Sequence, residues 1–183
     1  MSIASEPEPN AKNMIPDFAL CHITFYELPQ PANDSEWHHY QHRAGVKVTH
    51  QCCALLGELK KAPRRTFRGP ARLHDTYSLM TQAQTEVLTY CAAYFEGNAQ
   101  AEPVIALAAT GPYWKWAVIS FTDVEGLHDW ADHTENDERA KELRKKFQPR
   151  PFVLGTRKSD RELTKISQQH IYPLLSIPHV DAI

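Results

Sequence analysis

The sequence predicts a single mixed α/β domain with a central mixed sheet flanked by helices. Its 183 residues suffice for one ordinary domain and are too few for two full ones. Hydrophobic residues make up 42% of the chain and charged residues 23%, a composition that supports a buried core. Two long strand-like segments, a helical segment, a hairpin and further helical segments follow one another, which is typical of a mixed α/β fold.

The first part of the chain is expected to form two strands joined by a loop. Residues 1–14 are polar and contain prolines, so we expect a disordered or loosely attached tail before a domain over 15–183. Residues 18–28 are rich in aromatic and β-branched side chains and predict a strand. Residues 29–44 contain the Pro, Asn, Asp and Ser of a loop. A second strand is expected over 46–61.

A helix and a hairpin are expected next. Asp75 is a suitable N-cap for a helix that ends at Gly97. Residues 103–110 predict a strand, Gly111 a turn, and residues 113–121 the hairpin partner. Apolar residues of the helix recur at three- and four-residue spacing and predict one buried stripe: Leu79, Ala83, Val87, Tyr90 and Tyr94.

The last part of the chain is expected to be mainly helical. Residues 123–147 are charge-rich and helical in character, most clearly from 137 to 147. Residues 151–155 predict a short strand, and residues 160–175 an amphipathic helix. The apolar side of that final helix is expected to consist of Leu163, Ile166, His170 and Ile171.

Charge and targeting signals limit the function classes. A formal charge of −2 excludes a strongly basic nucleic-acid coat but allows a local basic patch. No apolar run approaches the ~20 residues of a membrane helix. Residues 1–15 lack the apolar stretch of a signal peptide. We therefore expect an intracellular, soluble protein, with nucleus and cytoplasm not distinguishable, and no membrane partner.

The cysteines and histidines do not predict a metal site. No Cys-x-x-Cys pair exists, and each cysteine has apolar neighbours, so buried free thiols are expected. The histidines cluster in a polar, turn-rich stretch in which no helical i, i+4 ligand pair is expected. The residues concerned are Cys21, Cys52, Cys53, Cys91, His38, His39, His42 and His50.

The end of the second predicted strand carries the clearest chemical pattern. Alternate residues of a strand share a face, so Glu58 and Lys60 point the same way and Leu59 points opposite. Placing these charges directly after an apolar run is costly unless they have partners. Pro16 begins the preceding strand, so Asp17 is expected to stand beside Glu58 on a neighbouring strand.

Two converging carboxylates make a hard-oxygen site that suits Mg²⁺. A lysine beside such an ion can orient an attacking water and stabilise charge on a phosphate oxygen. Asp17, Glu58 and Lys60 therefore fit metal-assisted hydrolysis of a phosphodiester.

The pattern resembles the PD-(D/E)XK nuclease superfamily: Pro16-Asp17 is followed about forty residues later by Glu58-Leu59-Lys60. The predicted helix and strand that come next also follow the order of that family. The helix often carries a Gln and a Tyr facing the site, and here it offers Gln82, Gln84 and Glu86, with Tyr90 four residues past Glu86. Over residues 15–175 the chain most resembles fungal relatives of this fold.

The resemblance implies a restriction-endonuclease-like core and an Mg²⁺-dependent endonuclease acting on DNA. Asp17, Glu58 and the carbonyl of Leu59 would be the metal ligands, and Lys60 the catalytic lysine. Because double-stranded DNA needs two cuts, a homodimer would suit this activity. The remaining roles fall on residues around that site: Gln82 or Glu86 would position substrate or ligands, and Arg64, Arg65 and Arg68 could hold phosphates.

Several alternatives stay open. The family core has a helix and a strand before the Pro-Asp strand, and only fourteen polar residues precede Ile15, so a shortened N-terminus is expected. A catalytically inactive domain that binds a protein or nucleic acid is therefore an alternative. Glu58 and Lys60 could also form a solvated strand end, and the three arginines a solvated loop. Trp114 and Trp116 could stack on bases or be buried under a helix, and a small-molecule pocket near Trp114 and His128 is a weaker alternative.

Overall fold

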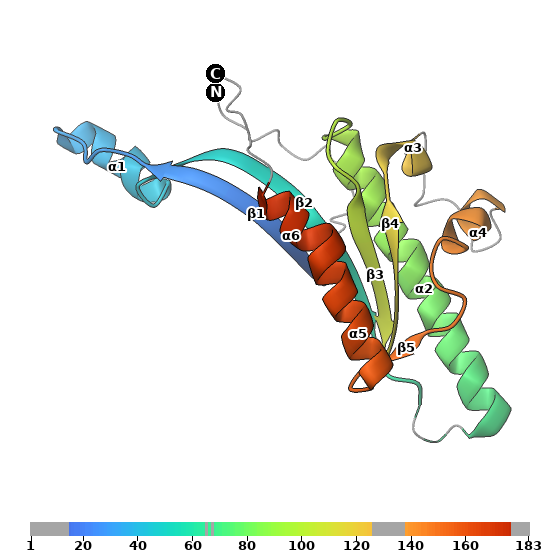
Figure 1. Cartoon of the computed structure of the whole chain (residues 1–183). Helices are drawn as coiled ribbons and strands as arrows, with labels where there is room; N and C mark the ends of the chain where they lie inside the picture. The colour runs from blue at the N-terminus through green and yellow to red at the C-terminus, as the bar shows by residue number, and fades with distance from the viewer. Residues whose placement is uncertain (1–14, 65, 67, 126–137, 177–183) are drawn as a thin grey trace, which may run out of the picture.

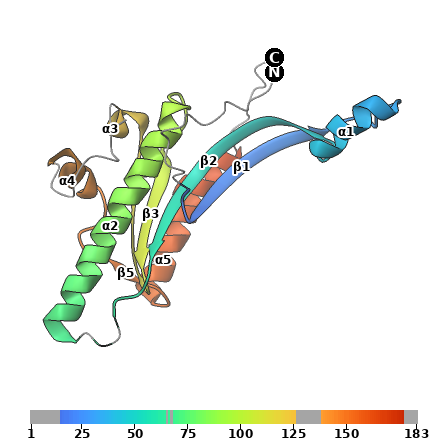
Figure 2. The same cartoon turned by 180° about the vertical axis from the view of Figure 1, so that it is seen from behind.

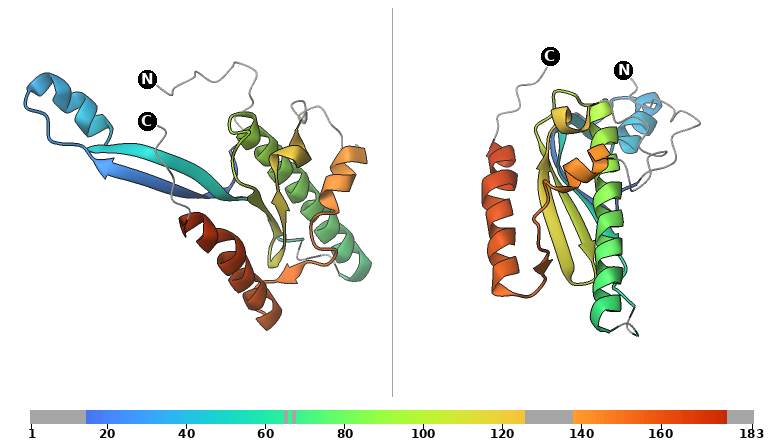
Figure 3. Two further views of the ribbon diagram at one scale, coloured as in Figure 1. Left: turned by 45° about the horizontal axis from the view of Figure 1, so that its top comes forward. Right: turned by 90° about the vertical axis from the view of Figure 1, so that its right-hand side faces the viewer.

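A computed structural model describes residues 15–64, 66, 68–125 and 138–176. The expected tail over 1–14, Arg65 and His128 lie outside the described residues. The described chain forms one five-stranded sheet between two helical layers, which the side view in Figure 3 separates clearly. Its strands are β1 (Phe18–Glu27), β2 (Val46–Lys60), β3 (Val104–Thr110), β4 (Tyr113–Ile119) and β5 (Phe152–Val153).

The strand order follows the chain order, β1-β2-β3-β4-β5. β1 and β2 are antiparallel, and β4 is antiparallel to both β3 and β5. β2 and β3 are parallel, and helix α2 (Gly69–Glu96) connects them. A parallel pair needs such a crossover, because two parallel strands cannot be joined by a tight turn. The mixed α/β prediction is therefore confirmed.

Helix α2 ends where the sequence predicts but begins about two turns earlier. Arg68 is the N-cap residue, and Pro70 stands in the first turn, where its missing N–H costs nothing. Asp75 lies inside the helix instead of capping it, so the predicted start was wrong. Its carboxylate accepts a hydrogen bond from the backbone N–H of Arg64 at 2.9 Å, which ties the connection after β2 to the helix.

The sheet separates two hydrophobic clusters. Figure 2 shows α2 across one face, and Figure 1 shows α5 (Arg157–Ile166) across the other. The predicted α2 stripe is half right, since Ala83 and Val87 are fully buried whereas Leu79 is only half-buried. The cluster under α2 includes Met80, Ala83, Val87, Leu88, Cys91, Phe95, Val104, Ala106 and Ile119. The cluster under α5 includes Leu55, Ile105, Trp114, Trp116, Phe152 and Ile166.

The outer halves of β1 and β2 leave the body as a two-stranded ribbon with helix α1 (Asp34–His42) at its tip (Figure 1). We call this ribbon and helix the arm, residues 21–53. The predicted loop over 29–44 is therefore wrong in its centre. The expectation that this stretch holds no helical i, i+4 histidine pair is wrong too, since His38 and His42 lie one turn apart on α1. Asn33 caps α1, because its side chain accepts a hydrogen bond from the N–H of Glu36 at 3.2 Å. None of the α1 residues is buried, which explains why hydrophobic periodicity did not reveal the helix.

The C-terminal part combines short helices. The segment predicted to be helical, 123–147, overlaps the end of α3 (Phe121–Val124) and contains α4 (Glu138–Arg144). Both helices lie beside α2, as Figure 3 shows, and residues 126–137 lie outside the described residues. The final helix was predicted over 160–175, and it begins earlier at α5, capped by Thr156. It continues through a π-helical turn (Ser167–Ile171) into α6 (Tyr172–Ser176).

Two predictions about which side chains are buried were wrong in part. Leu163 is 39% exposed, so it does not belong to the apolar side of the final helix. Cys53 and Cys91 are buried free thiols as expected, but Cys21 is exposed and Cys52 is half-buried.

Across the described ranges, none of the helices combines the length and apolar character needed to span a membrane.

Candidate functional site at the end of β2

Glu58 and Lys60 lie on the α2 face of the sheet, as strand alternation predicts. Glu58 is only 5% exposed, whereas Leu59 on the opposite face is 51% exposed. The Lys60 Nζ atom donates to Glu58 Oε1 at 2.7 Å and to Oε2 of Glu86, from α2, at 2.5 Å. A buried carboxylate bound to a half-buried ammonium is not a solvated strand end, so that alternative is wrong.

The charges of this cluster influence one another. Burial raises the pKa of Glu58, and the neighbouring Glu86 carboxyl adds to the rise, whereas the hydrogen bond from Lys60 opposes it. Burial disfavours the Lys60 cation, but its hydrogen bonds to the two carboxylates outweigh that effect and raise its pKa. Lys60 is therefore a cation held between two acids.

Tyr90 lies one turn after Glu86 on α2 and faces Glu58. Burial, together with the charge of Glu58 and a hydrogen bond to it, raises the pKa of Tyr90 to about 12. The phenol therefore stays protonated at neutral pH and can donate its hydrogen to the Glu58 carboxylate. Glu58 thus has hydrogen-bonding partners on both its own strand and α2.

Asp17 lies at the same end of the sheet, one residue before β1. Phe18 is the partner of Gly57 in the antiparallel register, which places Asp17 beside Glu58 as predicted. The Asp17 Oδ2 atom accepts a hydrogen bond from the backbone N–H of Leu59 at 2.6 Å. Gly57 allows this close pairing, since a Cβ there would lie 2.2 Å from the Phe18 ring.

The oxygen donors of Asp17 and Glu58 are of the type that Mg²⁺ prefers. Mg²⁺ binding would compete with the hydrogen bonds that these carboxylates make to Leu59 and Lys60. Asp17, Glu58 and Glu86 do not form a group of three whose oxygens all lie within 4.8 Å of one another. Within the part of the chain that the structure describes, only His22, His50 and Cys52 form such a group of potential metal ligands.

The other predicted site residues lie on α2 or on the connection that precedes it. Gln82 is half-buried on α2 and lies one turn before Glu86, on the same side of the helix. Gln84 is buried in a neighbouring pocket. Arg64 and Arg68 are exposed between β2 and α2, and Arg65 lies outside the described residues.

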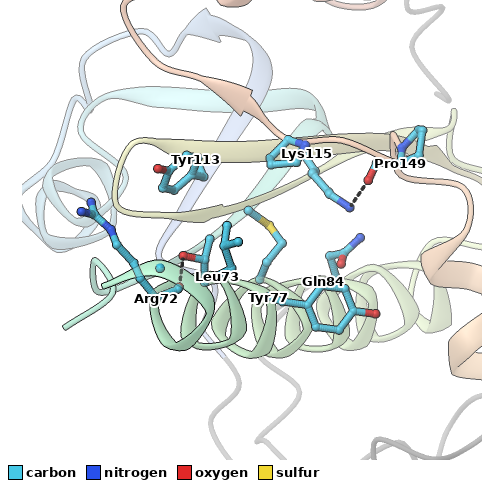
Figure 4. Close-up of a pocket in the computed structure, with 11 residues that line it drawn as sticks. Arg72, Leu73, Tyr77, Gln84, Tyr113, Lys115 and Pro149 are labelled. Atoms are coloured by element: carbon cyan, nitrogen blue, oxygen red, sulfur yellow. Dashed lines mark hydrogen bonds between the residues drawn. The ribbon is translucent and has the colours of Figure 1, made fainter. Parts of the chain in front are cut away.

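A pocket of about 460 Å³ lies between α2 and β4, next to the cluster (Figure 4). The register connects the two places: Glu58, Ala108 and Lys115 form one row across the sheet. The next row is Lys60, Thr110 and Tyr113. Paired residues on neighbouring strands face the same way, so the strand-end charges and the pocket share one face.

Two basic residues line this pocket and were not predicted as site residues. Arg72 comes from α2, and Lys115 comes from β4, where its Nζ donates to the carbonyl of Pro149 at 3.3 Å (Figure 4). Burial lowers the pKa of Lys115, which eases loss of its proton or favours an anionic partner. Lys115 alternates with Trp114 and Trp116 along β4, so it faces away from them.

The tryptophans are core residues. Trp114 and Trp116 are buried in the α5 cluster, so stacking on bases is excluded for them. The Trp114 Nε1 donates to Ser159 Oγ at 3.1 Å, and the Trp116 Nε1 donates to Glu162 Oε1 at 3.1 Å. The expectation of a hairpin face buried under a helix is therefore confirmed.

No protein-family model matches the chain, and no curated protein and no solved structure matches it either. Any functional inference therefore depends on the geometry and chemistry of the residues described above.

Proposed function

We propose that this chain is a PD-(D/E)XK-like nuclease domain that hydrolyses DNA phosphodiesters with Mg²⁺. The observation that carries the proposal is the buried Glu58–Lys60 pair at the end of β2, with Asp17 held beside it. A buried ion pair contributes little net stability because both ions lose their hydration. Charged groups placed at such a cost, with shifted pKa values, are typical of functional sites.

The order of elements supports the same proposal. Asp17 precedes a strand that is antiparallel to the strand carrying Glu58 and Lys60. Helix α2 follows and contributes Glu86 and Tyr90 to the cluster, and β3 then lies parallel to β2. The resemblance noted in the sequence implies this succession of segments, and a restriction-endonuclease-like core is accordingly part of the proposal.

Each residue has a proposed role in hydrolysis. Asp17, Glu58 and the carbonyl of Leu59 would hold Mg²⁺, which lowers the pKa of a bound water and polarises the phosphate. Lys60 would donate a hydrogen bond to the phosphate oxygen on which negative charge develops. Glu86 keeps Lys60 oriented and charged in the resting site. Arg72 and Lys115 in the adjoining pocket would bind neighbouring phosphates of the strand.

A plasmid assay tests the proposal. Supercoiled plasmid is incubated with Mg²⁺ and either the wild-type chain, Lys60→Ala or Lys61→Ala, the last being an exposed lysine next in sequence. We expect wild type and Lys61→Ala to nick the plasmid at similar rates. We expect Lys60→Ala to be slower by on the order of 100-fold or more, the usual cost of losing a transition-state donor. Equal cleavage by wild type and Lys60→Ala, or no cleavage by either, would contradict the proposal.

A second candidate function is a catalytically inactive module that binds protein through the arm. Apolar side chains are exposed on both strands of the arm, including Ile23, Phe25 at 58% and Val48 at 51% exposure. Exposed apolar patches of this kind mark interaction surfaces. Sedimentation of wild type and Phe25→Asp checks self-association: a module of this type would leave plasmid intact, and Phe25→Asp would reduce its association. Monomeric behaviour of wild type would remove the arm as a dimer surface.

A further inference from the structure

We propose that His22, His50 and Cys52 form a Zn²⁺-binding site at the base of the arm. One ring nitrogen from each histidine and the cysteine sulfur all lie within 4.8 Å of one another. Thiolate and imidazole are the ligands that Zn²⁺ takes in proteins. A sulfur- and nitrogen-containing set does not suit Mg²⁺, so this site is chemically separate from the one at the end of β2.

Strand register brings the three side chains together. His22 on β1 is directly opposite Cys52 on β2, and His50 stands two residues before Cys52 on the same strand. Directly paired residues and residues two apart share a face of the ribbon. The two imidazole rings have centroids 5.6 Å apart and are tilted by 55°, so they face a common space without stacking.

A β-bulge decides that Cys52 faces this group. Leu20 pairs with Leu55, but Cys21 pairs with Cys53, so Ala54 is the extra residue. The bulge changes the alternation, and Cys53 points into the core under α2. Cys52 points to the other face, where it joins the two histidines.

The group of three side chains is half-buried and lies near an acidic residue, Glu102. All three side chains are half-buried, and the Nε2 atom of His50 is buried from solvent. Burial raises the pKa of the Cys52 thiol, the backbone N–H of His22 opposes this, and the nearby charge of Glu102 adds to the rise. Binding of Zn²⁺ would convert the thiol to a thiolate and release one proton to solvent.

A cavity of about 350 Å³ adjoins the group. Cys52 and His50 are among the residues that line it, together with Glu102, Tyr94 and Leu174. Two of the three ligands, His50 and Cys52, face this cavity, which leaves room for a water as fourth ligand, the arrangement of open zinc sites. The inferred site is therefore a three-ligand Zn²⁺ site that joins both strands of the arm where they leave the body.

Metal titration of the full chain tests this inference. Protein in metal-free buffer is titrated with Zn²⁺ by calorimetry, and with Co²⁺ by absorption spectroscopy. We expect one ion per chain, and a thiolate-to-Co²⁺ charge-transfer band. Loss of a residue that only supports a ligand typically costs roughly 10–100-fold in metal affinity. We therefore expect Cys52→Ser and His50→Asn, which each remove a ligand, to weaken Zn²⁺ binding by more than about 100-fold.

Two matched controls identify the site. Cys21→Ser changes the exposed cysteine next to His22, and His38→Asn with His42→Asn removes a competing pair one turn apart on α1. Both variants should bind Zn²⁺ within about twofold of wild type, because neither removes one of the three proposed ligands. Absence of binding by wild type, equal affinity of Cys52→Ser, or loss of binding in the α1 variant would overturn the inference. If Cys52→Ser fails to fold, the charge-transfer band of Cys21→Ser decides, because the band requires a thiolate ligand and its loss in that variant would assign the ligand to Cys21 and overturn the inference.

Discussion

Glu58 is the residue at which burial and charge oppose each other most directly. Its carboxylate is almost completely buried, and its neighbours are an ammonium, a second carboxyl and a phenol. Lys60 lowers the cost of its negative charge, but burial outweighs this and the pKa remains raised. The folded protein therefore holds the Glu58 proton more tightly than the unfolded chain does.

The stability of the fold should depend on pH through Glu58. Because the folded pKa is above the ordinary value of 4.5, the contribution of Glu58 to stability is complete below that value. It is lost as pH rises through the raised pKa. Urea unfolding of wild type and Glu58→Gln from about pH 4 to pH 8 should show the free energy of unfolding of wild type falling relative to Glu58→Gln.

The control for this experiment is Glu142→Gln, which changes an exposed carboxylate on α4. Its unfolding free energy should run parallel to that of wild type over the same pH range. A constant difference between wild type and Glu58→Gln would contradict the pKa shift of Glu58.

The sequence predicts most of the strand-end cluster and misses the histidine–cysteine group, because strand alternation holds on one side of the bulge at Ala54 and is interrupted at the bulge itself. Alternation with a period of two places Glu58 and Lys60 correctly, because β2 is regular from Leu55 onward. The same rule misplaces Cys52 and Cys53 relative to Leu55, because Ala54 is an extra residue between Cys53 and Leu55 and nothing in the local sequence signals a bulge. The choice of Glu86 as the partner of Lys60 depends on how α2 rotates against the sheet, which periodicity alone does not determine.

At the scale of elements, short helices depend on polar contacts at their ends. α1 was missed because capping by Asn33, and not an apolar stripe, marks its start. α3 has four residues and is held by Asp123, whose Oδ2 accepts from the N–H of Ser120 at 2.9 Å and from its hydroxyl at 2.8 Å. The other oxygen of Asp123 forms an ion pair with Lys146, which connects α3 to the segment after α4.

Asp123→Asn should destabilise the protein at neutral pH by about 1 kcal/mol, the usual value of a helix cap. Burial alone would raise the pKa of Asp123, but hydrogen bonds from Lys146 and Ser120 outweigh it and lower the pKa. This stabilisation is therefore present above the ordinary value of 3.8 and is lost as pH falls through the lowered pKa. Thermal unfolding at neutral and acidic pH measures the difference, with the exposed Glu125→Gln as control. A difference that grows toward acid would contradict the assignment.

At the scale of the whole molecule, the protein consists of a covered body and an uncovered arm. β3 has helices on both faces and contains fully buried residues such as Val104, Ala106 and Ala108. The arm exposes Phe25, Tyr26 and Val48 and ends in a helix with no buried side chain. Figures 1 and 2 show that the arm extends away from both helical layers.

Amide hydrogen exchange should separate these two parts. We expect backbone amides of residues 104–110 to exchange on the order of 100-fold or more slowly than those of residues 24–28 and 46–48, because few buried contacts resist local opening of the arm. Mass spectrometry of peptides from these ranges provides the measurement. Equal protection in both ranges would mean that a contact absent from this monomer covers the arm.

A rotation of the arm about the bulge at Ala54 would move the tip of the arm over a large distance. Eight residues of β2, from Val46 to Cys53, extend outward from it. At a rise of about 3.3 Å each they form a lever roughly 26 Å long. A rotation of about 10° at the bulge would displace the far end of the strand, at Val46, by roughly 4–5 Å. An ion that joins β1 to β2 next to this bulge would therefore restrict the positions that α1 can take.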